Sequence, residues 1–526
     1  MGIQENSNGD GGLSTITMGK INRYRRMDAE ITEEEEEQVH NHKSSNINNS
    51  TKRFVIACAI FASLNMVLIG YDVGVMSGAI LYIQEDLNLT EVQEEVLVGC
   101  LSIISLFGSL AGGKASDAIG RKWTMGFAAI VFQSGAAVMS FAPSFNVLLV
   151  GRLLAGIGIG FGVMIAPVYI AEISPAVSRG SLTSYPEIFV NVGILLGYVS
   201  NYAFSGLSVH INWRIMLGVG ILPSVFIMLS LCVIPESPRW LVMQNRIEEA
   251  RLVLMKTNEN QGEIEERLAD IQAAAGDPNG KNKYEEKAVW RELLSPSPAL
   301  RSMLVTGIGI QFFQQITGTD SCVYYSPKIF QEAGIEDKTK LLAATVAVGF
   351  SKTIFILFAI VLIDRAGRKP LLYVSTVGMT ICTFGLVVNL SLLAKEQVGI
   401  ALAILFVCGN VGFFSVGMGP ICWVVTSEIF PLKVRAQAAA LGAVVNRLGS
   451  GLISMSFLSA CRAFTMAGTF FIFAVLAALS IAFVHIFVPE TKGKSLEQIE
   501  LMFQKGEESQ RGQFELEDMA HLVQKE

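Results

Sequence analysis

A polar stretch inside an otherwise apolar segment is the part of the chain best suited to bind a small polar molecule. It runs from Gln311 to Pro327 and reads QFFQQITGTDSCVYYSP. An amide side chain both donates and accepts hydrogen bonds. Polar groups at membrane depth are costly unless they face a cavity or a partner. We therefore expect this segment to line a wet binding site inside a membrane protein.

A carboxylate in the first apolar run is a second candidate for chemistry. Asp72 lies within Gly-Tyr-Asp-Val-Gly, and the fourth apolar run has Arg152 as its only basic residue. A carboxylate at this depth needs a partner or must take up a proton. Two hypotheses follow: a static ion pair between Asp72 and Arg152, or a carboxylate that loads and releases a proton as the pair forms and breaks.

The elements that must position these residues are membrane-spanning helices. Of the 526 residues, 51% are hydrophobic and 16% are charged, against roughly 25% charged residues in an average soluble domain. A helix needs about 20 apolar residues to cross about 30 Å of hydrocarbon. Runs of this kind lie near 54–83, 92–113, 122–142, 145–168, 184–205, 213–234, 301–325, 341–363, 370–393, 398–425, 437–460 and 464–488. We predict an all-α membrane protein with twelve transmembrane helices in two pseudo-symmetric six-helix halves.

Three motifs recur in the same order in the two halves. Asp117-Ala-Ile-Gly-Arg-Lys returns as Asp364-Arg-Ala-Gly-Arg-Lys, and Glu172-Ile-Ser-Pro returns as Glu428-Ile-Phe-Pro. Pro-Glu-Ser at 235–237 returns as Pro-Glu-Thr at 489–491. Repeats at similar spacing indicate a duplicated unit, and a binding site between the two copies is typical of transporters.

The hydrophilic segments complete the predicted organisation. No Lys or Arg occurs from Phe54 to Gly113, whereas Lys114, Arg121 and Lys122 follow at once. Basic loops lie on the cytoplasmic side, so both termini are predicted to be cytoplasmic. The predicted regions are a disordered N-terminal tail (1–53), an N-terminal half (54–234), a cytoplasmic helical linker domain (235–298), a C-terminal half (299–488) and a C-terminal tail (489–526).

Charged residues of the repeated motifs suggest a latch at the cytoplasmic side that breaks during a cycle. The alternative is that these charges only set the topology. The predicted members are Asp117, Arg121, Glu172 and Arg179 in the first half, and Asp364, Arg368, Glu428 and Arg435 in the second.

These motifs, with Pro-Glu-Ser-Pro-Arg-Trp at 235–240 and Pro-Glu-Thr-Lys-Gly at 489–493, resemble the sugar porter family of the major facilitator superfamily over residues 54 to 500. The resemblance implies a carrier that works by alternating access. It also implies contacts with sugar hydroxyls from the paired Gln314 and Gln315, which open a signature that includes Tyr324, and from Asn446. An aromatic side chain at the position of Trp423 packs on the substrate in that family.

The chain departs from the sugar porter pattern at charged positions. Glu187 stands where the family usually has Gln, Asp320 where Asn is common, Lys352 where animal carriers have Asn, and Arg447 where glucose carriers have Trp. Asp320 and Lys352 either pair structurally or face the substrate, where they offer charge-assisted hydrogen bonds. Glu187 either accepts hydroxyl protons or carries a proton itself. This set is similar to the plant polyol/monosaccharide proton symporters, which also carry Asp and Arg at the positions of Asp72 and Arg152.

The function hypothesis is proton-coupled uptake of linear polyols, cyclitols or monosaccharides. A passive facilitator is the alternative from the same class, and a non-transporting sugar sensor is the alternative from a different one. Expected partners are a small polyhydroxylated substrate and the lipid bilayer, without nucleic acid. We expect a functional monomer, in the plasma membrane rather than the vacuolar membrane, with no metal and no cofactor besides the transported proton. No constellation of nucleophile and base suggests an enzyme.

Overall fold

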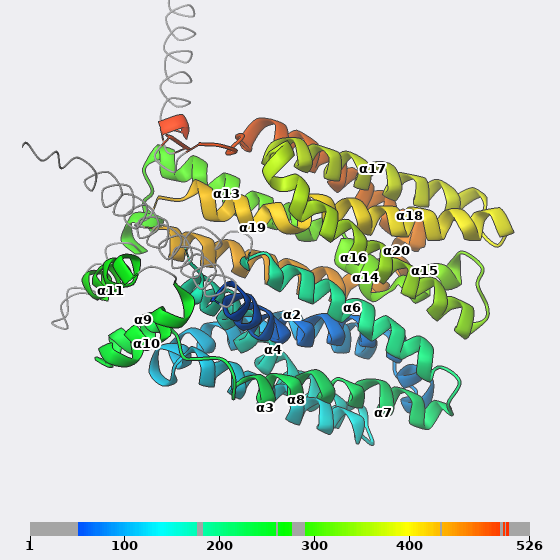
Figure 1. Ribbon diagram of the computed structural model, residues 1–526. Helices are drawn as coiled ribbons and strands as arrows, with labels where there is room; N and C mark the ends of the chain where they lie inside the picture. The colour runs from blue at the N-terminus through cyan, green and yellow to red at the C-terminus, as the bar shows by residue number, and fades with distance from the viewer. Residues whose placement is uncertain are drawn as a thin grey trace, which may run out of the picture.

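The chain forms two groups of long helices that lie side by side (Figure 1). The computed structural model describes residues 51–175, 182–258, 261–275, 290–431, 434–494, 498–499 and 501–503. Within these residues the secondary structure is helical, with no strand. The predicted all-α fold class therefore holds for the described part of the chain.

The first bundle contains six crossings built around close helix contacts. Its helices are Thr51–Leu87, α2 (Glu91–Ile119), α3 (Arg121–Ser140), α4 (Phe145–Ile173), α6 (Tyr185–Phe204), and α7 (Val209–Val219) continued by α8 (Ile221–Ser230). A Cβ atom added at Gly158 of α4 would lie 2.6 Å from the backbone nitrogen of Phe132 on α3. Small residues let helices approach this closely in lipid, where packing must replace the hydrophobic effect.

The second bundle repeats the plan with more irregular helices. Its helices are α13 (Pro298–Ile316), α14 (Thr319–Tyr324), α15 (Ser326–Glu332), α16 (Lys338–Ala366), α17 (Arg368–Leu392), α18 (Gln397–Val416), α19 (Met418–Ile429) and α20 (Arg435–Phe487). Inside α20 the backbone leaves the helical conformation at Thr465, with φ 66° and ψ 164°. His485 lies beside Tyr373 near the start of α17, and Arg435 beside Phe430. The two ends of α20 therefore lie at the same end of the molecule, so α20 supplies two crossings.

The predicted crossing at 301–325 is broken in the structure. In the described residues ten helices are long and apolar enough to span a membrane, and α13 is not among them because of its polar side chains. Gly318 ends it in a left-handed conformation, with φ 79°, and an added Cβ would lie 2.5 Å from the Phe473 ring. Only glycine takes this conformation without strain. Counting α13 to α15 as one interrupted crossing and α20 as two gives the twelve predicted crossings.

Three short helices form a separate small core at one end of the molecule, which we call the linker end (Figure 1). They are α9 (Pro238–Met243), α10 (Ile247–Thr257) and α11 (Gln261–Ala275). Trp240, Leu254 and Leu268 are among the buried residues of this core. Arg267 of α11 donates to the carbonyl oxygens of Glu172 (3.0 Å) and Ser174 (2.8 Å), which attaches α11 to the end of α4. The exact limits of the five predicted regions stay predictions.

Candidate functional site

Three glutamines of α13 and one asparagine of α20 form a hydrogen-bonded amide cluster. Asn446 Nδ2 donates to Gln311 Oε1 (2.9 Å) and to Gln314 Oε1 (2.5 Å). Gln315 Nε2 donates to Asn446 Oδ1 (3.2 Å). All four side chains are buried. Because each amide is fixed by the others, the cluster is oriented before any ligand arrives.

The cluster is also tied to α19. Gln314 Nε2 donates to the carbonyl oxygens of Met418 (2.9 Å) and Gly419 (2.8 Å). Gln311 Nε2 donates to Thr426 Oγ1 (3.2 Å). Trp423, the aromatic residue that the resemblance places on the substrate, belongs to the same helix and is 38% exposed.

Several buried polar atoms on α6, α13 and α14 have no hydrogen-bond partner in the described part of the chain. They include Gln315 Oε1, Thr319 Oγ1, Ser321 Oγ and Asn191 Oδ1. Leaving a buried polar atom unpaired costs about 1–3 kcal/mol. A ligand that supplies hydroxyl groups recovers part of that cost, so these atoms favour a polyhydroxylated molecule.

Four charged side chains lie around the same region without pairing. Glu187 of α6 interacts electrostatically with Lys352 of α16 and with Arg447 of α20, and all three interact with Asp320. Among the described residues no ion pair joins any two of them. Lys352 is 7% exposed, and its ammonium group lies 5.1 Å from the Phe414 ring centroid. Asp320 and Lys352 thus do not form the ion pair that one of the two hypotheses requires.

Asp72 and Arg152 form a buried ion pair inside the first bundle. Arg152 Nη1 lies 2.5 Å from Asp72 Oδ2, and the side chains are 0% and 2% exposed, respectively. Arg152 Nε donates to the Leu97 carbonyl oxygen (3.0 Å), while Nη2 is buried without a partner in the described part of the chain. Tyr324, 3% exposed at the end of α14, interacts electrostatically with both members of the pair. The pair therefore adjoins the broken crossing of the second bundle.

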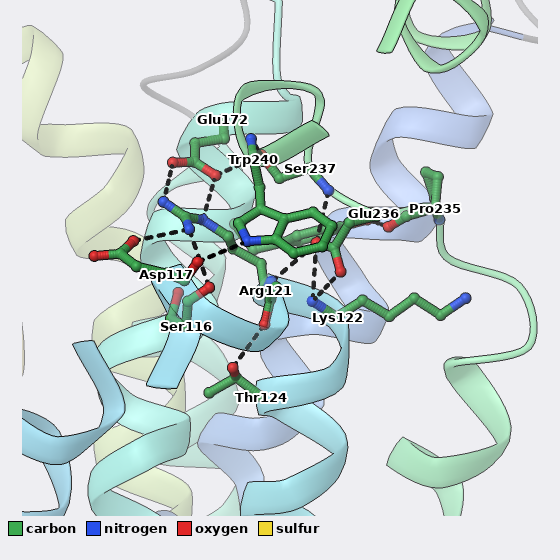
Figure 2. A network of polar contacts seen from close by, with 12 residues as sticks. Ser116, Asp117, Arg121, Lys122, Thr124, Glu172, Pro235, Glu236, Ser237 and Trp240 are labelled. Carbon is green, nitrogen blue, oxygen red and sulfur yellow. Dashed lines mark hydrogen bonds and ion pairs between the residues drawn. The ribbon is translucent and has the colours of Figure 1, made fainter. Parts of the chain in front are cut away.

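At the linker end, the Arg121 guanidinium group binds two acidic side chains of the first bundle (Figure 2). Its Nε and Nη2 donate to the two carboxylate oxygens of Glu172 at 3.0 and 3.1 Å, and Nη1 donates to Asp117 Oδ1 at 3.0 Å. Ser237 Oγ adds a hydrogen bond of 2.5 Å to Glu172 Oε2. The bidentate geometry fixes the orientation of both partners.

Glu236, which sequence reasoning did not select, caps the start of α3. Its carboxylate accepts the backbone N–H groups of Arg121 (2.9 Å), Lys122 (3.1 Å) and Ser237 (2.8 Å), as Figure 2 shows. Negative charge at a helix N-terminus is stabilising. Burial raises the pKa of the Glu236 carboxyl, against the opposite effect of these N–H donors.

The second bundle repeats this network. Arg368 Nη2 donates to Glu428 Oε1 (2.9 Å), and Thr491 Oγ1 donates to Glu428 Oε2 (2.6 Å). Glu490 accepts the backbone N–H groups of Arg368 (3.0 Å) and Lys369 (2.9 Å). Burial acts to raise the pKa of the Glu490 carboxyl, but the N–H donors outweigh it and lower that pKa. The recurrence of Pro-Glu-Ser as Pro-Glu-Thr was the signal available in the sequence for both caps.

Three predicted latch residues are not placed in these networks by the described contacts. Arg435 Nε donates to the Phe430 carbonyl oxygen (3.1 Å), and among the described residues Arg435 pairs with no carboxylate. Arg179 and the side chain of Asp364 lie outside the described residues. The described contacts of the networks around Arg121 and Arg368 each join residues on one side of the molecule, and none of these contacts links the two bundles. Any contact of Arg179 or of the Asp364 side chain lies outside the described residues.

Acids of the first bundle meet hydrogen-bond donors of the second at the opposite end. We call these four contacts the inter-bundle clasp: Glu94 with Lys328 (2.5 Å), Glu95 with the backbone N–H and the hydroxyl of Ser459 (2.7 Å each), Glu85 with Lys338 (2.5 Å), and Glu91 with Arg462. Glu94 and Glu95 are 0% and 3% exposed. The two bundles are therefore closed against each other at this end.

Comparison with known proteins assigns the arrangement. Residues 57–503 match the sugar (and other) transporter family. The chain belongs to this family. It is 67% identical to "Probable polyol transporter 4" of Arabidopsis thaliana over 527 residues, covering 100% of this chain and 99% of the relative. It is 47% identical to "Polyol transporter 5" of the same organism, covering 86% of each chain.

A solved structure confirms the fold of this transporter family member. The major facilitator superfamily proton:xylose symporter XylE, bound to 6-bromo-6-deoxy-D-glucose, matches with a TM-score of 0.71 and 27% identity. The match covers 86% of this chain and 100% of XylE. The predicted major facilitator fold is confirmed, as is the prediction of an integral multi-pass membrane transporter rather than an enzyme.

We expect Glu236→Ala to destabilise this transporter by about 1–2 kcal/mol, since a helix cap contributes roughly this much. The reason is that the N–H groups of the first two residues of α3, Arg121 and Lys122, lose their acceptor, as does the N–H of Ser237. The measurement is the Tm of the detergent-solubilised protein by intrinsic fluorescence. Glu249→Ala is the control, because its pair with Arg246 is about half exposed and such pairs contribute about 0–1 kcal/mol. Equal Tm values for the two variants would contradict the capping role.

Proposed function

We propose that this protein is a secondary active transporter that carries linear polyols, cyclitols or monosaccharides inward together with a proton. The observation that carries the proposal is the buried ion pair of Asp72 and Arg152. This pair adjoins the interrupted crossing from α13 to α15, which also carries the glutamines of the amide cluster. A buried carboxylate requires either a cation beside it or a bound proton, so we expect Asp72 to bind a proton when Arg152 moves away. A relative that is a proton:xylose symporter supports the coupling.

The proposed substrate site combines the amide cluster with the four unpaired charges. Its members are Glu187, Gln314, Gln315, Asp320, Tyr324, Lys352, Trp423, Asn446 and Arg447. Amides and charged groups together offer both donors and acceptors to successive hydroxyl groups of a flexible molecule. The names of two relatives as polyol transporters support a polyol as the substrate.

The proposed cycle follows from which end is closed. The clasp closes one end, while the described contacts of the linker-end networks stay within one bundle. With the linker and both termini in the cytoplasm, as the distribution of basic residues predicts, this is a state closed to the outside. Transport then requires rocking of the bundles about the central site, with different substrate affinities in the two states. We place the protein in the plasma membrane as a monomer.

Uptake into proteoliposomes of the purified full chain tests this function. Labelled glucitol, mannitol, myo-inositol, xylose and glucose are supplied at two external pH values, with and without a protonophore. We expect accumulation of at least one polyol that the protonophore abolishes. Equal uptake with and without a gradient would indicate the passive facilitator instead. Specific binding without flux would indicate the sensor and overturn the carrier.

Asn446→Ala is expected to raise KM for the transported polyol about 10- to 100-fold, because it leaves two acceptors and one donor unpaired at about 1–3 kcal/mol each. The atoms concerned are Gln311 Oε1, Gln314 Oε1 and Gln315 Nε2. The measurement is initial uptake rate against substrate concentration. Asn389→Ala is the matched control, since Asn389 is buried near the end of α17 and its side chain, among the described residues, bonds only to the Gly399 carbonyl oxygen of α18. An unchanged KM in Asn446→Ala would remove the amide cluster from the substrate site.

A further inference from the structure

Two serine hydroxyls connect the proposed substrate residue Asp320 to the opposite bundle. Ser450 Oγ of α20 donates to Asp320 Oδ2 at 2.6 Å. Ser102 Oγ of α2 lies 3.2 Å from Ser450 Oγ. Both serines are buried, 5% exposed at Ser102 and 4% at Ser450. A polar chain therefore crosses the seam between the bundles and ends on a carboxylate of the candidate site.

The donor and acceptor in each of these hydrogen bonds follow from the single hydrogen that each hydroxyl group carries. A hydroxyl group has one hydrogen to donate and can accept at its oxygen. Ser450 donates its hydrogen to Asp320 Oδ2, so it accepts from Ser102. The order is Ser102 to Ser450 to Asp320. The other carboxylate oxygen, Asp320 Oδ1, has no hydrogen bond within the described residues and is available to a substrate hydroxyl.

The seam around these serines is too tight for larger side chains. A Cβ atom added at Gly99 of α2 would lie 2.1 Å from Met455 Cγ, and one added at Gly451 of α20 would lie 2.6 Å from Ile103 Cγ1. The hydrogen bond between Ser102 and Ser450 thus exists because α2 and α20 are in direct contact. When these helices separate, the chain must break at that bond.

The same two helices carry part of the inter-bundle clasp. Glu95 of α2 lies two helical turns before Ser102 and binds Ser459 of α20. Opening of the clasp end therefore pulls apart the helices that hold Ser102 and Ser450. The hydrogen-bonding state of Ser450, and through it that of Asp320, follows the opening and closing of this end.

We propose that Ser450 is a positioning residue that orients Asp320 toward the substrate, and that Ser102 makes this orientation depend on closure of the seam. Once α2 withdraws, Ser450 loses its donor and its hydroxyl is free to rotate. Asp320 then offers substrate a different hydrogen-bond geometry in the two states. A ligand drives a conformational change only by binding the two states differently. The hydrogen bonds from Ser102 to Ser450 to Asp320 supply such a difference at the proposed polyol site. The inference rests on the proposed function.

The test measures KM and Vmax of polyol uptake in proteoliposomes for Ser450→Ala, Ser102→Ala and Asp320→Asn, and for the pairs. A hydrogen bond to a charged group contributes enough for KM to rise about tenfold in Ser450→Ala, with Vmax within about twofold. We expect Ser450→Ala to add nothing in the Asp320→Asn background, because residues of one network are not additive. Ser102→Ala is expected to add nothing to Ser450→Ala. Ser456→Ala is the control on α20, since its hydroxyl is exposed and its described hydrogen bonds stay within its own helix.

The outcomes separate this inference from the proposed function. Absence of flux in the unmodified protein, or an unchanged KM in Asp320→Asn, overturns the site itself. Flux with a raised KM in Asp320→Asn but an unchanged KM in Ser450→Ala overturns only the serine chain, as do additive effects of the two serine variants. Ser450→Cys, which fills similar space with a weak S–H donor, replaces Ser450→Ala if that protein does not fold. The same rise in KM is expected for it.

Discussion

Asp72→Asn is expected to abolish the accumulation of substrate against its gradient while leaving exchange intact. A proton gradient of one pH unit supports about tenfold accumulation with one proton per substrate, since one unit corresponds to about 1.4 kcal/mol. Asn keeps the shape of Asp and one acceptor for Arg152 Nη1, but it cannot bind and release a proton near neutral pH. The accumulation ratio should therefore fall to about one, whatever the pH difference, because a carrier without proton linkage only equilibrates its substrate.

Counterflow measures the exchange that should survive, with substrate preloaded inside the vesicles. Asp270→Asn is the matched control, because Asp270 is exposed on α11 and far from Arg152 in the fold. The control should accumulate substrate like the unmodified protein. Undiminished accumulation by Asp72→Asn would refute the proton role and leave the pair with Arg152 as a static one. Loss of counterflow as well would indicate a folding defect, which size-exclusion chromatography detects.

Lys328→Ala is expected to slow uptake strongly by opposing closure of the clasp end. Glu94 is 0% exposed and its carboxylate lies 2.5 Å from the Lys328 ammonium. Removing one partner of a buried ion pair costs about 3–5 kcal/mol because the other charge stays buried. Opening this end lets water reach Glu94 and avoids that cost. A penalty of this size shifts the balance between the two states by about a factor of 100 or more, so Vmax should fall by a similar order.

Two further variants separate this effect from general damage. Glu94→Gln in the Lys328→Ala background removes the unpaired charge and should restore much of Vmax. Lys338→Ala, which breaks a half-exposed pair with Glu85, should change Vmax little because such pairs contribute about 0–1 kcal/mol. Lowering the pH on the clasp side should also relieve Lys328→Ala, since a protonated Glu94 needs no cation. No recovery in the double variant would contradict the electrostatic role of the pair.

The sequence predicts the crossings and the family well because both depend on local patterns. Apolar length fixes most spans, and ordered motifs such as the repeated Asp-x-x-Gly-Arg-Lys turns identify the family. The partner of Asp72 was also predictable, since Arg152 is the single cation of its span. The repeated motifs indicated that Glu236 and Glu490 have the same role in the two halves. The sequence does not say which groups such a repeated acid binds, so the helix caps could not be predicted from it.

The clasp and the serine chain could not be predicted because they join residues that only the packing of the two bundles brings together. Glu94 and Lys328 are 234 positions apart by their numbers, and Ser102 and Ser450 are 348 apart. A serine within an apolar helix usually bonds to its own backbone, so nothing in the sequence sets Ser450 apart. The break at Gly318 was equally hidden, because the Phe473 ring that leaves no room for a side chain at this position belongs to a later helix.

The polarity of α13 has a consequence for how the protein is made. The helix does not qualify as a span by its own hydropathy, and a segment leaves the translocation channel for lipid according to its own apolarity. Gln311, Gln314 and Gln315 find their partners on α19 and α20, which are synthesised more than 100 residues later. We infer that α13 stays beside the translocation channel, or beside helices already inserted, until α19 and α20 leave the channel. The glutamines of the proposed substrate site would then also determine how fast this part of the chain inserts into the membrane.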